Sequence, residues 1–312
     1  MDSAVSVPSV RAELGPGIYR VHKRTGQTSF ELVKAFMEEA RVAGIRREKL
    51  PACHGGALDP FAEGLVLLLA GQATRLMDLL HAAPKTYVAE TSWGAETDNG
   101  DPLGRVVERG DAARLTPPAL DDALAAFVGW RDQVPPATSN KRVAGERAYR
   151  KAHRGESFEL PPSRVYLHQA RWLEHRLPAA STLLLVTGGG YYVRALARDL
   201  GRSTGARAHL SALRRTAIGP WTDPAPGERV WLRGAELFPW LGSVRVDAAE
   251  TNALRAGKRI PMRPIDPPQW ALPSGFPEPR AHIRALHDSG LVAIVREKDG
   301  ELIGDPALRS SI

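Results

Sequence analysis

The chain has 312 residues, of which 43% are hydrophobic and 25% charged, which is typical of a folded globular protein of about two domains. Lysine and arginine exceed aspartate and glutamate by seven (42 − 35), and this balance favours a polyanionic partner, although a solvated basic surface has the same composition. The single cysteine, Cys53, excludes an internal disulfide and a multi-cysteine zinc site. No apolar run approaches the roughly 18 residues of a membrane span, and no apolar core follows a basic start as in a signal peptide. We therefore expect a cytoplasmic protein without a membrane partner.

The first predicted elements are a loose leader over residues 1–16, a strand over Gly17–Lys23 and a helix that begins at Thr28. Thr28 and Glu31 have the spacing of a capping box, in which each side chain bonds the backbone N–H of the other residue. Gly44 suits the C-terminal end of this helix. Apolar residues at helical spacing predict its buried face: Phe30, Val33, Met37 and Ala40.

A glycine-rich stretch, Cys53–Gly64, precedes the first long apolar run. Gly55 and Gly56 carry no side chain, so another backbone or a ligand can approach them closely. Asp59 stands before a proline, which favours an extended or turn conformation. The stretch can therefore present a carboxylate for nucleophilic or acid–base chemistry, although an isolated Asp-Pro is more often a turn or a helix N-cap.

Strands and helices alternate without a strict repeat as far as residue 240. Leu65–Ala70 and Leu183–Val186 predict buried strands. Apolar spacing predicts helices over Ala73–Leu80, Leu120–Phe127 and Val193–Leu200. Alternation in the strand that begins at Lys85 places these residues on one face: Tyr87, Ala89, Thr91 and Trp93.

Basic residues gather in two tracts. Residues 130–155 hold seven lysines and arginines against two acids, and residues 194–215 hold six arginines against one acid. On charge alone, such a tract is more often a solvated surface than a binding site.

From about Leu241 the pattern indicates a small β module. Residues 261–281 hold seven prolines, too many for regular structure. Leu291–Val295 and Glu301–Gly304 then flank Asp299-Gly300, a dipeptide typical of a tight hairpin turn.

The glycine-rich stretch resembles the signature of the bacterial tRNA pseudouridine synthase B (TruB) family. The residues that carry this resemblance are His54, Gly56, Leu58, Asp59, Pro60, Ala62 and Gly64. Cys53, Gly55 and Glu63 depart from the family pattern. Other segments resemble the family in the same order along the chain: 23–29, 85–87, 94–104, 133–155, 190–194 and 208–215.

This resemblance implies a mixed α/β (α+β) fold. A pseudouridine synthase catalytic domain with a central mixed sheet would span residues 17–240. A small PUA-like RNA-binding β domain would follow over residues 241–312.

The resemblance also implies an activity, the isomerisation of uridine 55 in the T-loop of tRNA to pseudouridine. The base would be flipped out of the RNA, and the reaction would depend on an aspartate and need no cofactor or metal. The implied catalytic residues are Asp59, Tyr87, Arg194 and Leu213. The implied RNA-binding residues are Lys23, His54, Lys141, Arg142, Arg154, Tyr192 and Arg214. Whether Asp59 adds covalently to the substrate or acts as a base stays open.

The residue types suit these roles. A buried carboxylate tends to stay protonated unless a cation lies beside it, and a guanidinium such as that of Arg194 keeps its charge at any working pH. We expect a monomer whose partner is the T-arm stem-loop of tRNA. The alternatives are a guide-RNA-dependent synthase, which would need protein partners, and a non-catalytic tRNA chaperone or RNA-binding protein.

Overall fold

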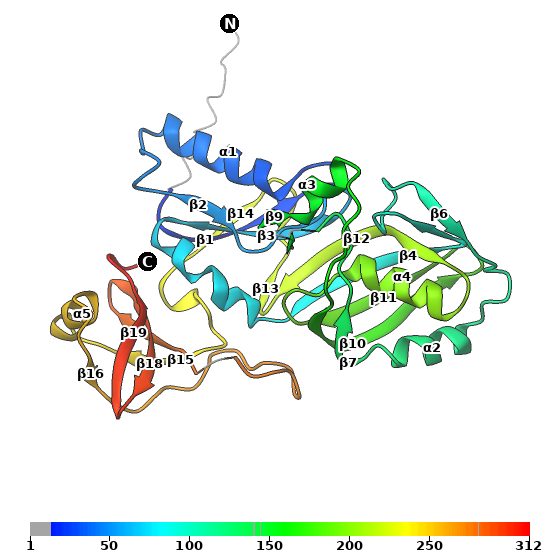
Figure 1. Ribbon diagram of the computed structural model, residues 1–312. Coiled ribbons are helices and arrows are strands. Elements are labelled where there is room, and N and C mark those ends of the chain that lie inside the picture. The colour runs from blue at the N-terminus through cyan, green and yellow to red at the C-terminus, as the bar shows by residue number, and fades with distance from the viewer. Residues whose placement is uncertain (1–13, 140, 144, 280) are drawn as a thin grey trace, which may run out of the picture.

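The structure, a computed structural model, describes residues 14–139, 141–143, 145–279 and 281–312 (Figure 1). It has the mixed α/β fold that the sequence predicts, with a large central sheet and a smaller C-terminal sheet. The predicted leader lies outside the described residues, apart from residues 14–16. No helix in the described ranges is long and apolar enough to cross a membrane.

A ten-stranded sheet forms the centre of the molecule. Its main path runs in the spatial order β14 (Arg229–Leu232), β1 (Gly17–Lys23), β3 (Glu63–Ala70), β12 (Ala208–Ile218), β4 (Lys85–Trp93), β11 (Ala180–Thr187), β10 (Ser163–Arg176) and β7 (Gly129–Gln133). Off this path, β2 (Ala52–His54) pairs with β3, and β13 (Trp221–Thr222) pairs with β12. Strands β3 and β12 pair in parallel, and the other pairs are antiparallel.

Each face of the large sheet carries its own apolar core. Helices α1 (Ser29–Val42), α2 (Pro117–Ala125) and α4 (Val193–Ser203) contribute to one cluster, and the 3₁₀ helix η1 (Gly71–His81) contributes to the other. Strand β3 is buried on both sides, as predicted, because alternate residues enter the two clusters. In β4 the predicted face is also buried, so the alternation is confirmed.

The predicted capping box at the start of α1 is confirmed, since Thr28 and Glu31 exchange the expected bonds. The predicted buried face is wrong at Phe30, which is 58% exposed. The helix turns the Ser29 side chain inward, so the buried stripe runs through Val33, Phe36 and Ala40, and Phe30 falls about 100° to one side. The ring of Phe30 lies instead beneath the ammonium group of Lys34.

The C-terminal unit is a five-stranded sheet with one helix. Its spatial order is β15 (Gly242–Arg245), β17 (Ile283–His287), β18 (Gly290–Lys298), β19 (Glu301–Ala307) and β16 (Ile260–Pro261), with α5 (Ala248–Arg255) beside it. The predicted hairpin turn is confirmed, because Asp299 and Gly300 have φ of 57° and 76°, the two positive values of a type I′ turn.

The proline-rich segment between β16 and β17 runs back along the molecule to the large sheet (Figure 1). There the ring of Phe276 contacts the ring of Tyr166 on β10, and the Tyr166 hydroxyl donates to the Gly275 carbonyl at 2.9 Å. Residues of both sheets, among them Leu65 of β3 and Leu291 of β18, also share an apolar cluster. The domain boundary between residues 240 and 241 therefore stays a prediction.

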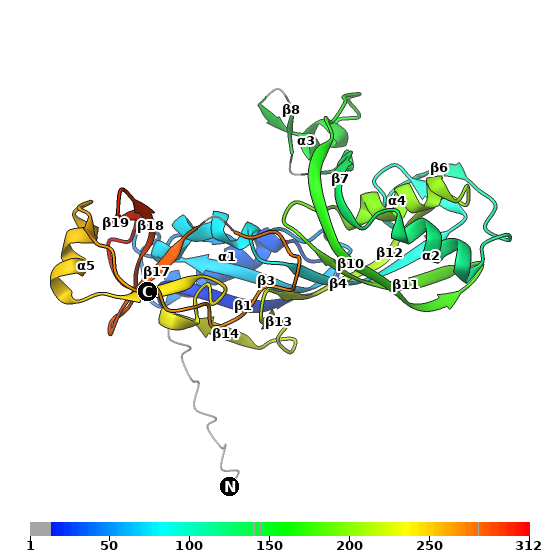
Figure 2. The ribbon, with the colours of Figure 1, turned by 90° about the horizontal axis from the view of Figure 1, so that it is seen from below.

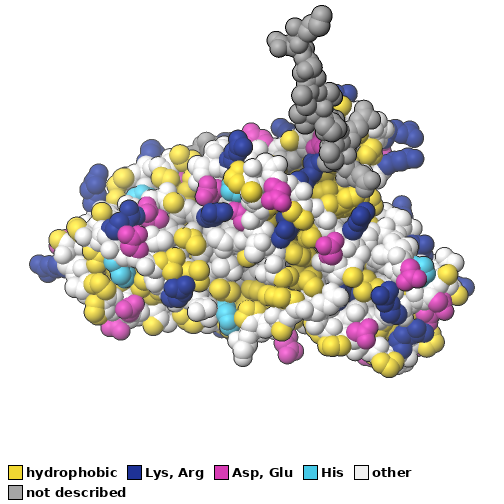
Figure 3. Space-filling model, turned by 180° about the vertical axis from the view of Figure 1, so that it is seen from behind, with side chains coloured by type: hydrophobic (Ala, Val, Ile, Leu, Met, Phe, Trp, Pro, Cys, Tyr) yellow, Lys and Arg dark blue, Asp and Glu magenta, His cyan; other side chains and the backbone are white. Residues whose placement is uncertain are grey.

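The remaining elements lie outside the two sheets. They are β5 (Ala95–Thr97), β6 (Val106–Arg109), β8 (Arg142–Val143), β9 (Glu146–Arg147), α3 (Ala148–His153) and η2 (Gly234–Glu236). Figure 2 shows β8 and α3 projecting from the sheet near β7 and β10. On the face seen from behind, apolar side chains run along the middle, and basic side chains are scattered rather than gathered in one patch (Figure 3).

Candidate active site

The carboxylate of Asp59 and the guanidinium of Arg194 form a bidentate ion pair. Arg194 Nε donates to Asp59 Oδ2, and Nη2 donates to Oδ1, both at 2.9 Å. Asp59 lies in the loop that precedes β3, and Arg194 lies in the first turn of α4. The predicted contact between these two residues is therefore confirmed, while their catalytic roles stay predictions.

The remaining donors of Arg194 are also satisfied. Nη1 donates to the Asn99 carbonyl and to the Thr138 hydroxyl, both at 2.7 Å, and Nη2 donates to the Thr138 carbonyl at 3.1 Å. A guanidinium has five N–H donors, so every one of them has a partner here. Because the side chain is 3% exposed and all its donors are bonded, the Arg194 guanidinium is held in one position.

The electrostatics of Asp59 combine burial with a neighbouring cation. Burial raises the pKa of the Asp59 carboxyl above its ordinary value, and the Arg194 guanidinium opposes that rise. The Asp59 side chain keeps 33% exposure, while Arg194 is buried behind it. This arrangement presents a carboxylate toward solvent and backs it with a permanent positive charge.

The backbone beside Asp59 is held by hydrogen bonds from distant parts of the chain. The Ser29 hydroxyl bonds both the N–H and the carbonyl of Leu58, at 2.9 and 3.3 Å. Arg215, which is buried, donates from Nη2 to the Gly56 carbonyl at 3.0 Å and from Nε to the Leu65 carbonyl at 2.8 Å. Strand β12 and helix α1 therefore position the loop.

Gly64 lets β3 and β12 approach each other next to this loop. Its φ is +107°, a conformation that L side chains rarely adopt. An added Cβ would lie 2.3 Å from the backbone oxygen of Arg215, its parallel partner in register. Glycine is therefore required at this position for two separate reasons.

Lys23 lies inside the protein rather than on an RNA-facing surface. The side chain is fully buried, and Nζ donates to the carbonyls of Gln27 at 2.6 Å, Arg24 at 3.1 Å and Pro60 at 3.4 Å. Burial lowers the pKa of Lys23 to about 8. These contacts tie the 23–29 segment to the residue after Asp59, so in this structure Lys23 supports the loop.

Tyr87 and Leu213 lie in the apolar cluster that flanks the ion pair. Tyr87 is 8% exposed and Leu213 is 5% exposed, and both share this cluster with Leu58 and Phe61, which lie on either side of Asp59 in the sequence. The pairing of β4 with β12 places Tyr87 opposite Arg215, which bonds the Gly56 carbonyl in the loop of Asp59, and places Leu213 opposite Ala89.

His54 and Tyr192 are half-buried and lie on separate elements. His54 ends β2, and Tyr192 is the N-cap residue of α4. The Gln133 side-chain amide accepts from the Tyr192 N–H at 2.9 Å and donates to the Tyr192 carbonyl at 3.0 Å. Burial raises the pKa of the Tyr192 hydroxyl, which keeps it protonated.

The four other residues predicted to bind RNA are all exposed. Two of them, Arg154 and Arg214, form ion pairs with carboxylates of the protein. Lys141 and Arg142 lie at the start of the projecting segment, and Arg142 donates to the Gly145 carbonyl at 3.2 Å. Arg154 is paired with Glu146 and Glu156. Arg214 is likewise paired with Asp223, at 2.8 Å.

Sequence reasoning missed several residues that hold the ion pair. Asn99 and Thr138 accept hydrogen bonds from Arg194, and Ser29 and Arg215 fix the loop around Asp59. Each of them lies in a segment that resembles the TruB family, but that resemblance assigned them no role. Asn99 acts through its backbone carbonyl, which any residue would provide, whereas Ser29, Thr138 and Arg215 act through their side chains.

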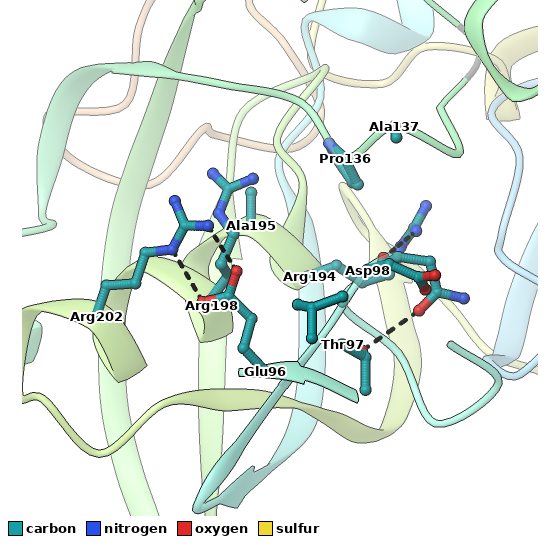
Figure 4. Close-up of a pocket in the computed structure, with 12 residues that line it drawn as sticks. Glu96, Thr97, Asp98, Pro136, Ala137, Arg194, Ala195, Arg198 and Arg202 are labelled. Carbon is teal, nitrogen blue, oxygen red and sulfur yellow. Dashed lines mark hydrogen bonds and ion pairs between the residues drawn. The ribbon is translucent and has the colours of Figure 1, made fainter. Parts of the chain in front are cut away.

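A cavity of about 310 Å³ lies beside Arg194 (Figure 4). It is bounded by α4, by the loop over residues 96–100, and by Pro136 and Ala137. The carboxylate of Glu96 pairs with Arg202 at its edge.

Among the described residues, no group of three or more His, Cys, Asp or Glu side chains could hold a metal ion.

Comparison with solved structures identifies the fold. The structure of an H/ACA RNP bound to a substrate RNA containing 2′-deoxyuridine matches with a TM-score of 0.63 and 17% identity, over 94% of this chain and 84% of that one. A Cbf5-Nop10-Gar1 complex matches with a TM-score of 0.62 and 20% identity, over 93% of this chain and 83% of that one. A family model described as TruB family pseudouridylate synthase, N-terminal domain, matches residues 45–193. The fold and the family model place the chain in the class of pseudouridine synthases.

Full-length relatives narrow the class to a family. A protein of Thermobifida fusca named tRNA pseudouridine synthase B is 36% identical over 88% of this chain and 95% of its own length. Relatives of the same name from Symbiobacterium thermophilum and Leifsonia xyli are 36% and 32% identical, over 78% and 94% of this chain and 81% and 98% of their own lengths. The chain belongs to the TruB family of pseudouridine synthases.

Proposed function

We propose that this protein converts uridine 55 in the T-loop of tRNA to pseudouridine, with Asp59 as the essential residue and without a cofactor. The observation that carries this proposal is the Asp59–Arg194 ion pair, in which an accessible carboxylate is backed by a buried guanidinium. The names of the relatives, tRNA pseudouridine synthase B, support tRNA as the substrate.

The reaction is an isomerisation whose atoms balance within the nucleotide. The N1–C1′ bond of uridine breaks, the uracil rotates, and a C5–C1′ bond forms. The proton on C5 is lost and N1 gains one, so the reaction involves no net oxidation or hydrolysis. An ionised Asp59 either adds covalently or removes a proton so that the base can depart, and both routes need the charge that Arg194 stabilises.

Tyr87 and Leu213 are proposed to shape the pocket for the base. In this proposal the Tyr87 ring stacks on the uracil, and its hydroxyl assists transfer of the C5 proton. Leu213, which lies on β12 in the same apolar cluster as Tyr87, is proposed to pack against the same base. Because the side chains of both residues are more than nine-tenths buried, they can offer the base a surface that excludes water.

The target uridine must leave its stack before it can reach Asp59, at a cost of a few kcal/mol. His54 is proposed to occupy the space that the flipped nucleotide leaves. Lys141, Arg142 and Tyr192 are proposed to contact the RNA backbone. Arg154, Arg214 and Lys23 are proposed to contribute less directly, because each already bonds a carboxylate or backbone carbonyls within the protein.

The C-terminal unit is proposed to be a PUA-like RNA-binding domain over residues 241–312. Its five-stranded sheet and its position beside the large sheet suit a module that contacts RNA outside the T-loop. The whole chain would act as a monomer.

The direct test incubates the purified protein alone with a T-arm stem-loop transcript and maps pseudouridine at single-nucleotide resolution. We expect product at position 55 of the T-loop and at no other uridine of the transcript. A transcript with cytidine at that position is the matched control and should give no product. Absence of product from the uridine transcript at every salt concentration would overturn the proposal.

The alternatives give different outcomes in the same assay. A guide-RNA-dependent synthase would leave the bare T-arm unmodified and need protein partners. A chaperone or binding module would bind the T-arm without product, and its RNA remodelling would survive Asp59→Asn. For a synthase, Asp59→Asn abolishes product while the affinity for RNA stays within a few-fold of wild type, because the side chain keeps its size.

A further inference from the structure

The segment over residues 133–139 precedes the projecting segment that holds β8, β9 and α3. It is joined to the start of α4 through polar contacts. They include Gln133 with the Tyr192 backbone, the Val134 carbonyl with Arg198 Nη2, and Thr138 with Arg194. The proposed RNA-binding residues Lys141 and Arg142 stand at the third and fourth positions after Thr138. The backbone N–H of Tyr149 in α3 donates to the Ser139 carbonyl at 3.1 Å, so a path of hydrogen-bonded residues links α3 to Arg194.

Thr138 is the member of this path that touches Arg194. Its carbonyl accepts from Nη2 at 3.1 Å, which any residue at this position could do. Its hydroxyl accepts from Nη1 at 2.7 Å, which needs threonine or serine. Nη1 has one other hydrogen bond, to the Asn99 carbonyl, and it lies 3.8 Å from Asp101 Oδ2. The Thr138 hydroxyl therefore accepts one of the two hydrogen bonds that this nitrogen donates.

The segment is not packed against α4 along its whole length. Pro136 and Ala137 line the cavity of about 310 Å³, with Arg194 and Arg198 on the opposite wall (Figure 4). Immediately before Thr138 the segment therefore lies over a space rather than over apolar side chains. Hydrogen bonds set the distance between Thr138 and the guanidinium.

We propose that Thr138 is a positioning residue, which orients the Arg194 guanidinium and through it the Asp59 carboxylate, and which links the RNA-binding loop to the reaction centre. The guanidinium is planar, so the two bonds to Asp59 and the bond to the Thr138 hydroxyl share one orientation. A rotation of the guanidinium therefore changes all three contacts together. This inference rests on the proposed function, since Asp59 is its point of action.

The test compares Thr138→Val, which keeps the shape and removes the hydroxyl, with Thr138→Ser, which keeps the hydroxyl. For Thr138→Val we expect the single-turnover rate of pseudouridine formation on a T-arm stem-loop to fall about tenfold, because a slightly misplaced catalytic group loses much of its rate. The dissociation constant for the RNA should stay within about twofold. Thr138→Ser should retain a rate within about twofold of wild type.

A second readout separates positioning from mere loss of stability. A less well held guanidinium stabilises the Asp59 carboxylate less, so the acid limb of the rate–pH profile in Thr138→Val should move to higher pH, by roughly half a unit or more. The matched control is Thr222→Val, which removes an exposed hydroxyl from β13. Neither its rate nor its acid limb should change.

A wild-type rate in Thr138→Val, or a lower rate with an unmoved acid limb and a lower melting temperature, would overturn the inference. Failure of the proposed function is distinguishable, because then the wild-type protein forms no product. In that case the carboxyl of Asp59 is titrated by ¹³C NMR in both proteins, without substrate. A titration midpoint that is higher in Thr138→Val supports the positioning role, and an unchanged midpoint refutes it.

Discussion

The hydroxyl of Ser29 accepts a hydrogen bond from the Leu58 N–H at 2.9 Å and donates one to the Leu58 carbonyl at 3.3 Å. Ser29 is the first residue of α1, and Leu58 immediately precedes Asp59. The two residues are 29 positions apart and both are buried. One side chain thus satisfies both backbone groups next to the proposed catalytic carboxylate.

Ser29→Ala should therefore lower both stability and activity. It leaves the N–H and the carbonyl of Leu58 without that partner in a buried place, which we expect to cost about 1–3 kcal/mol in the free energy of unfolding. The pseudouridine formation rate should fall as well, because Asp59 loses its neighbouring anchor. Urea denaturation and a single-turnover assay measure the two effects.

The control for this change is Ser203→Ala, which removes a hydroxyl that donates to the Leu200 carbonyl at the end of α4. That variant should keep the wild-type rate. If Ser29→Ala also keeps it, the bond between Ser29 and Leu58 has no part in positioning Asp59.

Gly64→Ala should be strongly destabilising. The added methyl group meets the Arg215 backbone oxygen at 2.3 Å, and the φ of +107° is itself unfavourable for alanine. We expect a loss of about 3 kcal/mol or more in the free energy of unfolding, from steric clash and backbone strain together. Chemical denaturation gives this number directly.

Gly44→Ala is the matched control for backbone strain alone. Gly44 has a φ of +79°, and a Cβ there would meet nothing within 4 Å. Gly44→Ala should lower the free energy of unfolding by about 1–2 kcal/mol, which is the cost of the left-handed conformation for a residue with a Cβ. Equal losses in the two variants would mean that β3 and β12 can separate to admit a side chain.

Local elements could be predicted from the sequence where specific capping or turn residues mark their ends. The Thr28–Glu31 capping box and the Asp299-Gly300 turn were predicted at the positions where the structure has them. The Asp59–Arg194 pair spans 135 positions, so only the family resemblance joined the two residues. Lys23 shows the limit of that resemblance: it implied an RNA-binding residue, whereas in the structure the side chain is buried and its ammonium group bonds backbone carbonyls.

The salt dependence of RNA binding should separate Arg142 from Arg154. Each phosphate contact makes the slope of log K, the association constant for RNA, against log salt concentration more negative by about one unit. Arg142→Ala should therefore make this slope shallower by about one unit. Arg154→Ala should change the slope less, since Glu146 and Glu156 already neutralise that guanidinium. Filter binding of a T-arm transcript across a salt series measures both slopes. Equal changes in the two variants would show that Arg154 releases its carboxylates to bind RNA.

Lys85 should make stability depend on pH. It lies at the start of β4, it is buried, and its Nζ donates to the carbonyls of Leu80 at 2.5 Å and Ala83 at 2.7 Å. Burial lowers the pKa of Lys85 to about 7, and repulsion from Arg215 adds to this. In the unfolded chain the pKa of a lysine is about 10.4.

Between pH 7 and about 10, the unfolded chain therefore binds more protons at this position than the folded chain, so the contribution of Lys85 to stability rises with pH. Lys85→Met removes that contribution and leaves the carbonyls without a donor, which is a cost that does not depend on pH. The stability of Lys85→Met relative to wild type should accordingly be highest at pH 7 and decline toward pH 9. Urea midpoints of both proteins at these two pH values give the difference, and a difference that does not change with pH would mean that Lys85 stays charged inside the protein.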